Sequence, residues 1–147
     1  MASPKSPRPN AASAASTTAP DLDREGCPCG GLAFDSCCGR YIDGGELPPT
    51  AEALMRSRYT AFVRQNAPYL IDTWAARTRP ATLDFDDAPQ WLGLQVKAHL
   101  QRDDAHAEVE FVARYKVGGR AHRLHERSRF ERTDDGRWRY IDGDLFD

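Results

Sequence analysis

The four cysteines of the chain lie in one short segment, and thiols at this spacing can bind a metal. They are Cys27, Cys29, Cys37 and Cys38. This C-x-C-x7-C-C pattern supplies four thiolates, which can complete the tetrahedral shell of one structural zinc ion and leave no open coordination position. Gly30, Gly31 and Gly39 let the backbone turn tightly around an ion, and Phe34 can serve as the apolar plug of so small a unit. The spacing therefore predicts a zinc-binding module over residues 25–45.

Two other states of the thiols are compatible with the same spacing. A disulfide framework is one of them, but the adjacent Cys37 and Cys38 would be awkward to pair with each other. Disulfides are also rare in the cytoplasm, the compartment that the sequence favours. Free structural thiols are the other alternative. A cluster of four ligands is a specific signal, so one structural zinc ion per chain is the favoured interpretation.

Length and charge exclude several classes of protein. With 147 residues the chain has room for one domain and a small appendage. It contains no stretch of about 20 apolar residues, as a spanning helix requires, and its N-terminus lacks the apolar region of a secretory signal. We therefore expect a cytoplasmic protein without membrane insertion. The formal net charge of −2 gives the whole molecule no field that attracts nucleic acid. The oligomeric state is not indicated.

Composition and periodicity predict a tail and two helices around the cysteine module. A disordered tail is expected over residues 1–24, because residues 1–20 are mostly alanine, serine, proline and threonine. Thr50 is a candidate N-cap for a helix with an apolar stripe over residues 51–63. A second, shorter helix is expected from about Pro68 to Arg77.

From Trp91 onward the apolar pattern has a period of two residues, which predicts strands. Turn signals at Gly118-Gly119 and Asp135-Gly136 separate long segments, so a meander of four antiparallel strands is expected. Strict alternation turns Leu92 and Leu100 toward the core and His99 toward solvent. Helices followed by strands are typical of an α+β fold with helices packed on one face of a curved sheet, here over residues 46–147.

Several segments resemble known bacterial proteins. The cysteine segment resembles a SEC-C motif, the small zinc module also found at the C-terminus of the SecA translocation ATPase, although its loop is one residue shorter than the common form and lacks lysine. Residues 49–62 (PTAEALMRSRYTAF), 126–130 (ERSRF) and 136–143 (GRWRYIDG) are similar to the uncharacterised YchJ-like family. The resemblance implies a cone-like fold of the nuclear-transport-factor-2/cystatin-like type, with the four cysteines as zinc ligands.

Cone-like folds often enclose a pocket between helix and sheet, and polar side chains are expected to point into it. Helical spacing places Arg58 within the apolar stripe, and strand parity turns Glu126 and Asp142 inward. Because a buried charge must be paired, Arg58 is expected to pair with one of these carboxylates. Such a pair can be purely structural, which is the favoured alternative. Otherwise Arg58 can anchor an anionic ligand, or Glu126 can act as a general base. The expected pocket residues are Arg58, Tyr59, Trp74, Glu126, Ser128, Tyr140 and Asp142.

The outer face of the predicted sheet is rich in arginine. The residues concerned are Arg123, Arg127, Arg129, Arg137 and Arg139. They could form a basic patch that contacts ribosomal RNA or an acidic protein. A solvated face neutralised by Glu108, Glu110 and Glu131 is the favoured alternative, because no aromatic side chains interleave the arginines as stacking platforms.

Two classes of function remain. In the first, the chain is a non-enzymatic adaptor whose zinc module docks a partner protein, and the resemblance to the SecA tail suggests the ribosome, a chaperone or the translocation machinery. In the second, the α+β domain is a small-molecule site or an enzyme and the zinc module is only structural. The adaptor is favoured, because a four-cysteine zinc site has no open position and no constellation with an evident nucleophile is present. No catalytic residue is therefore assigned.

Overall fold

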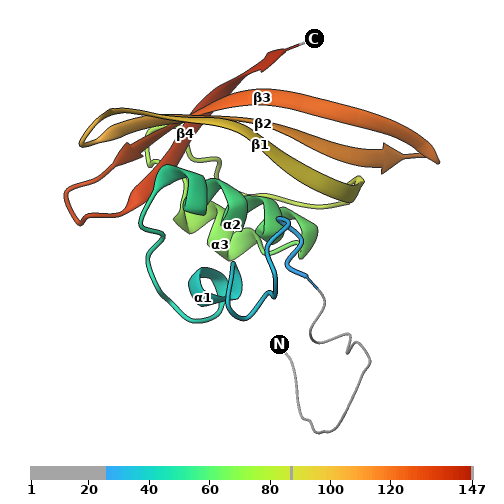
Figure 1. Cartoon of the computed structure of the whole chain (residues 1–147), viewed down its shortest axis with the longest axis horizontal. Helices are drawn as coiled ribbons and strands as arrows, with labels where there is room; N and C mark the ends of the chain where they lie inside the picture. The colour runs from blue at the N-terminus through green and yellow to red at the C-terminus, as the bar shows by residue number, and fades with distance from the viewer. Residues whose placement is uncertain (1–25, 87, 147) are drawn as a thin grey trace, which may run out of the picture.

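The computed structural model describes residues 26–86 and 88–146, so the tail expected over residues 1–24 lies outside it. The described elements are α1 (Gly39–Ile42), α2 (Ala51–Val63), α3 (Ala67–Asp72), β1 (Gln90–Asp103), β2 (His106–Val117), β3 (Arg120–Arg132) and β4 (Trp138–Phe146). The strands form one antiparallel sheet in the order β1-β2-β3-β4, and α2 and α3 cover one side of it (Figure 1). The predicted α+β architecture is confirmed. In the described residues, no helix is long and apolar enough to cross a membrane.

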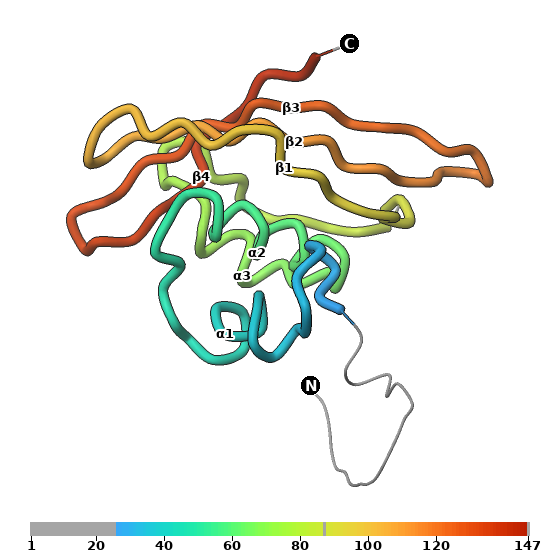
Figure 2. The backbone as a smooth tube through the Cα atoms, in the orientation of Figure 1, coloured from blue at the N-terminus to red at the C-terminus, as the bar shows by residue number. Residues whose placement is uncertain are grey.

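The two longer helices begin at side-chain caps. The Thr50 hydroxyl accepts a hydrogen bond from the backbone N of Ala53 (3.0 Å), and the Asn66 side chain accepts one from the backbone N of Tyr69 (3.1 Å). The backbone trace shows α1 on the side of α2 that is remote from the sheet (Figure 2). On its other side, α2 packs Leu54 and Met55 into the core. The predicted start of α2 is therefore confirmed.

Helix α3 ends at Asp72, so the predicted continuation to Arg77 is wrong. After Asp72 the chain pairs with the free edge of β4. The backbone N of Tyr140 donates to the Thr73 carbonyl (2.8 Å), and the backbone N of Ala75 donates to the Tyr140 carbonyl (2.7 Å). Two hydrogen bonds to the sheet thus replace the helical bonds that the local sequence favours, and Trp74 is held against Tyr140.

Single-residue bulges in β1 change which of its side chains face the core. Leu92 and Lys97 have no partner on β2, and each extra residue reverses the alternation. His99 consequently lies opposite the buried Val109, whereas Leu92 and Leu100 are 46% and 38% exposed. The predicted orientations of His99, Leu92 and Leu100 are therefore wrong, because strict alternation cannot anticipate a bulge.

The N-cap of α2 provides a test of how this helix is positioned. Substitution Thr50→Ala removes the acceptor for the Ala53 N–H and should lower the free energy of unfolding by about 1 kcal/mol. Chemical denaturation measures the change. Thr82→Ala is the matched control, since Thr82 is exposed and outside every helix and strand, and it should stay within about 0.5 kcal/mol of wild type. Equal effects of the two substitutions would contradict a capping role for Thr50.

Candidate functional site

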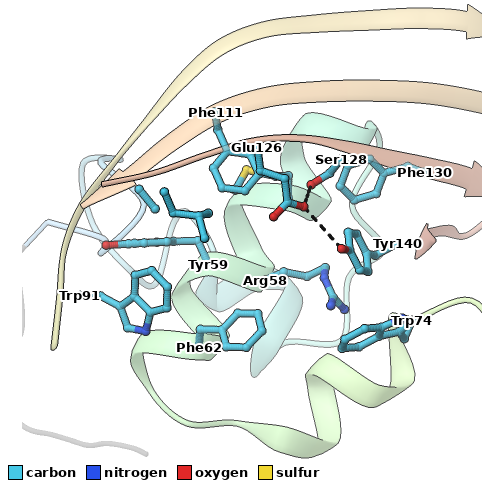
Figure 3. Close-up of a pocket in the computed structure, with 13 residues that line it drawn as sticks. Arg58, Tyr59, Phe62, Trp74, Trp91, Phe111, Glu126, Ser128, Phe130 and Tyr140 are labelled. Atoms are coloured by element: carbon cyan, nitrogen blue, oxygen red, sulfur yellow. Dashed lines mark hydrogen bonds between the residues drawn. The ribbon is translucent and has the colours of Figure 1, made fainter. Parts of the chain in front are cut away.

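A cavity of about 200 Å³ lies between α2 and the sheet (Figure 3). Six of the seven expected pocket residues line it, namely Arg58, Tyr59, Trp74, Glu126, Ser128 and Tyr140. Seven further residues complete the lining: Met55, Phe62, Trp91, Phe111, Ala113, Leu124 and Phe130. None of these seven is among the pocket residues expected from the sequence. Strand parity indicated their inward direction, but it carries no information on whether the space between the layers is filled.

Arg58 is a buried cation held by neutral groups. It is 5% exposed, and its Nη1 donates to the Leu70 carbonyl (2.8 Å) and to Thr73 Oγ1 (2.7 Å). Its Cζ lies 4.8 Å from the centre of the Trp74 ring and 4.6 Å from that of Tyr140. Burial lowers the pKa of Arg58 to about 10, so the side chain remains charged at neutral pH. In the part of the chain that the structure describes, no carboxylate forms an ion pair with it, so the predicted pairing is wrong.

Glu126 faces the same cavity from β3. Its Oε2 accepts hydrogen bonds from Ser128 Oγ (2.6 Å) and from the Tyr140 hydroxyl (3.4 Å), while Oε1 accepts none from the described residues. Burial and the nearby Glu126 charge raise the pKa of Tyr140, so its hydroxyl stays a donor at neutral pH. Gly143 on β4 provides the space, since a Cβ there would overlap Glu126 Oε2. The carboxylate is fixed through one oxygen and open at the other.

Asp142 does not belong to this cavity, and the prediction that it faces inward is wrong. In the pairing of β3 with β4, Tyr140 lies opposite Phe130 but Asp142 lies opposite Arg129, which leaves Ile141 as an extra residue. This bulge turns Asp142 to the outer face, where its side chain is 51% exposed and its Oδ1 accepts from Arg129 Nε (2.6 Å).

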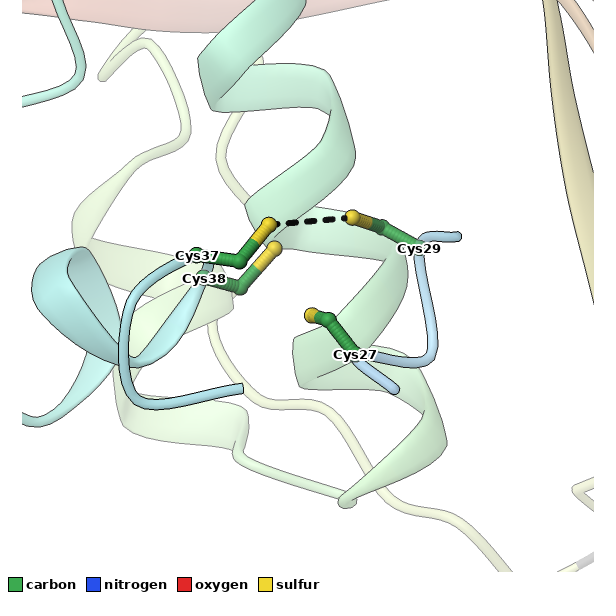
Figure 4. A group of neighbouring side chains, drawn as sticks. All are labelled: Cys27, Cys29, Cys37 and Cys38. Atoms are coloured by element: carbon green, nitrogen blue, oxygen red, sulfur yellow. Dashed lines mark hydrogen bonds between the residues drawn. The ribbon is translucent and has the colours of Figure 1, made fainter. Parts of the chain in front are cut away.

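The four cysteine sulfurs converge on one point between the cysteine segment and α2 (Figure 4). All four Sγ atoms lie within 4.8 Å of one another, and those of Cys29 and Cys37 are 3.5 Å apart. A tetrahedral ion with metal–sulfur bonds of about 2.3 Å requires sulfur–sulfur separations of about 3.8 Å, so this donor set fits a zinc ion. Three of the thiols are buried, and Cys37 is partly exposed. The arrangement can hold a metal ion.

Close packing of the backbone builds this centre. A Cβ at Gly31 would lie 2.5 Å from Cys37 Sγ, so only glycine leaves room for that thiol. The backbone N atoms of Cys37 and Gly39 both donate to the Phe34 carbonyl (3.0 and 2.7 Å), which turns the chain back toward the first two cysteines. Arg56 on α2 donates to the Cys29 carbonyl (3.1 Å). The centre is therefore fixed both within the segment and against α2.

The thiols share hydrogen bonds that separate their pKa values. Hydrogen bonds with the thiols of Cys29 and Cys38 lower the pKa of Cys27. The bond with Cys27 raises the pKa of Cys29 to about 11, and it also raises the pKa of Cys38. Without a cation, the cluster therefore favours one thiolate among protonated neighbours. A bound cation would allow the other thiols to ionise as well, because its positive charge would compensate for theirs.

Two of the five arginines expected on the outer face, Arg137 and Arg139, contact Asp72 at the end of α3, and the group is largely neutralised by ion pairs. Their N···O distances are 3.0 Å for Arg127–Glu110, 2.6 Å for Arg129–Asp142, 2.6 Å for Arg137–Asp72 and 3.1 Å for Arg139–Asp135. Arg123 is exposed, and among the described residues no ion pair joins it to a carboxylate. Glu131 pairs with Arg77 (2.6 Å) rather than with a member of this group. These ion pairs favour the interpretation of a neutralised face over that of a basic patch. Contact with RNA stays a prediction.

The fold and the cysteine centre together define an NTF2-like α+β protein with a four-cysteine segment before its first long helix. The family profile described as "YchJ, middle NTF2-like domain" matches residues 50–143. The chain belongs to this YchJ-like family, whose curated relatives are called UPF0225 proteins. The relative from Cupriavidus pinatubonensis is 61% identical over 125 residues, which cover 81% of this chain and 87% of the relative.

Two solved structures of SEC-C motif containing proteins are similar. The solution structure of RPA3114 from Rhodopseudomonas palustris has a TM-score of 0.74 and is 32% identical in sequence. The match covers 83% of this chain and 99% of RPA3114. The crystal structure of the protein from Psychrobacter arcticus has a TM-score of 0.71 and is 29% identical in sequence. That match covers 86% of this chain and 85% of the Psychrobacter chain. The resemblance to the YchJ-like family expected from the sequence is confirmed.

The contact between Gly31 and Cys37 can be tested by a single methyl group. Gly31→Ala should displace Cys37 Sγ and expose the thiols, so that a thiol-reactive reagent labels the folded protein about tenfold faster, equivalent to about 1.4 kcal/mol of lost protection. Gly93→Ala is the control, because a Cβ at Gly93 meets nothing within 4 Å, and its labelling rate should equal that of wild type. Unchanged labelling of Gly31→Ala would contradict the packing of this centre.

Proposed function

We propose that the chain is a cytoplasmic adaptor, in which one structural zinc ion holds a short loop in position to dock a partner protein. The observation that carries the proposal is the orientation of the cysteine segment. Its thiols face α2 and the core, whereas Leu32 on the loop between them is 93% exposed. We assign residues 25–45 to the zinc module and residues 46–147 to the NTF2-like domain.

A closed metal centre suits a structural role. Four cysteines would occupy every position of a tetrahedral zinc ion, which leaves none for a substrate or an activated water. Zinc would supply the positive charge that allows all four thiols to ionise and would cross-link the two ends of the loop. A reducing compartment keeps such thiols available to the metal, which agrees with a cytoplasmic location.

The loop presents an apolar side chain on a rigid support. The backbone N of Gly30 donates to the Cys27 carbonyl (2.9 Å), and the backbone N of Cys27 donates to the Gly31 carbonyl (3.1 Å). Leu32 follows this double turn, and Asp35 and Ser36 beyond it are exposed. A single exposed leucine is ordinary on a protein surface. On a loop fixed at both ends it loses little conformational entropy on binding, so a partner with an apolar depression can use its burial efficiently.

Metal content is the first test of the proposal. Elemental analysis of the purified protein should give one zinc ion per chain. A chelator should remove it and lower the free energy of unfolding by roughly 4 kcal/mol or more, as expected when a structural metal is lost. Cys38→Ser should lose the zinc, whereas Ser36→Ala, beside the ligands, should keep it. Folded protein that contains no metal and is insensitive to the chelator would refute the structural role of zinc.

The docking loop is tested by photo-crosslinking in cells. A photoreactive phenylalanine analogue at position 36 should crosslink one defined protein. Leu32→Asp should reduce that product at least tenfold, because burying a leucine side chain contributes about 1.5–3 kcal/mol. The same analogue at position 145, where Leu145 is 67% exposed on β4, is the control and should not capture this protein. Equal capture at both positions, or capture that Leu32→Asp leaves unchanged, argues against docking through this loop.

A further inference from the structure

The size and walls of the cavity between α2 and the sheet suit a single planar ring. A cavity of about 150 Å³ in an engineered protein accommodates benzene, so the space of about 200 Å³ found here has room for one ring with small substituents. Aromatic side chains form most of the lining, and neighbouring rings meet edge to face. The Tyr59 and Trp91 rings are 5.7 Å apart at 74°, and those of Phe130 and Tyr140 are 5.8 Å apart at 67°. Such walls favour an aromatic ligand over a branched aliphatic one.

One end of the cavity offers an unmatched positive charge. Arg58 is buried, and its two hydrogen bonds, to the Leu70 carbonyl and to Thr73 Oγ1, both use Nη1. Nε and Nη2 have no acceptor among the described residues. Neutral oxygens and ring faces compensate for a buried charge less well than an anion does. A planar carboxylate matches the guanidinium fork and would supply the missing acceptor.

The other charged group of the cavity is an acceptor. Glu126 Oε2 is held by Ser128 and Tyr140, and Oε1 accepts no hydrogen bond from the described residues. Figure 3 shows Arg58 entering from α2 and Glu126 entering from β3, with Tyr140 between their charged groups. A second carboxylate beside Glu126 would be repelled, whereas a hydroxyl or amino group could donate to Oε1. Arg58 therefore selects an anionic acceptor and Glu126 selects a hydrogen-bond donor, and together they determine how a bound ring is oriented.

We propose that this cavity binds a monocyclic aromatic carboxylate with a hydrogen-bond donor on the far side of the ring, of the hydroxybenzoate or aminobenzoate class. The carboxylate lies at Arg58, the ring lies among the aromatic side chains, and the donor reaches Glu126. This site is separate from the cysteine centre and does not depend on the docking proposal.

Calorimetric titration of the full-length protein tests the assignment with three probes. 4-Hydroxybenzoate carries both polar groups, benzoate lacks the donor and phenol lacks the carboxylate. We expect 4-hydroxybenzoate to bind with a Kd below about 1 mM and at least tenfold more tightly than either comparator. Tighter binding of the bifunctional probe supports recognition at both ends. Equal affinity for phenol and 4-hydroxybenzoate would reduce the site to an apolar cavity and overturn the proposal.

Three substitutions locate the binding. Ala113→Leu adds bulk to the cavity wall on β2 without changing a polar group, and it should abolish binding in a protein that circular dichroism shows to be folded. Glu126→Gln should weaken 4-hydroxybenzoate about tenfold and leave benzoate unchanged, because a charged acceptor is replaced by a neutral one. Glu110→Gln is its control, since Glu110 pairs with His125 and Arg127 on the outer face. No binding to folded wild type, or binding that Ala113→Leu does not affect, overturns the proposal.

Discussion

The burial of Arg58 is the constraint around which the helical side of this fold is arranged. A guanidinium taken out of water must find partners, and here they come from the end of α3 and from the segment that follows it. The same segment leaves the helix and adds to the free edge of β4, which places Trp74 and Tyr140 against the guanidinium. Arg58 thus links α2 and α3 to the last strand. The helix end, the strand edge and one wall of the cavity all depend on the same buried charge.

Helix α2 carries a second set of contacts, which attach the cysteine segment. Thr60 Oγ1 lies 3.5 Å from Cys27 Sγ, and Arg56 donates both to the Cys29 carbonyl and to Glu52 Oε2 (3.1 and 3.0 Å). Arg56 and Thr60 are four residues apart and so share one face of the helix, while Arg58 points to the cavity. The cysteine segment therefore stabilises the wall of the cavity from behind. Besides the chain connection over residues 43–50, it is attached to α2 by these direct contacts.

The sequence was sufficient to predict elements governed by regular periodicity. The apolar stripe of α2, the strand meander and the inward facing of Arg58, Glu126 and Tyr140 all follow from periods of 3.6 and 2 residues. The errors follow from local departures from those periods. Bulges at Lys97 and Ile141 reverse the facing of His99 and Asp142, and neither site has the glycine that often marks a bulge. Their positions depend on how two strands pair, which no single strand encodes.

The predicted partner of Arg58 was wrong for a different reason, and the error bears on the cavity itself. Sequence reasoning assumed that opposite buried charges meet, but Tyr140 stands between them: its ring lies under Arg58 and its hydroxyl bonds to Glu126. A direct ion pair between Arg58 and Glu126 would neutralise both charges and would bring α2 closer to β3. With Tyr140 interposed, each charge keeps one side open to the space between the layers. The cavity and its two polar ends therefore have a common origin in one tyrosine, whose position is fixed by the pairing of β4 with the segment after α3.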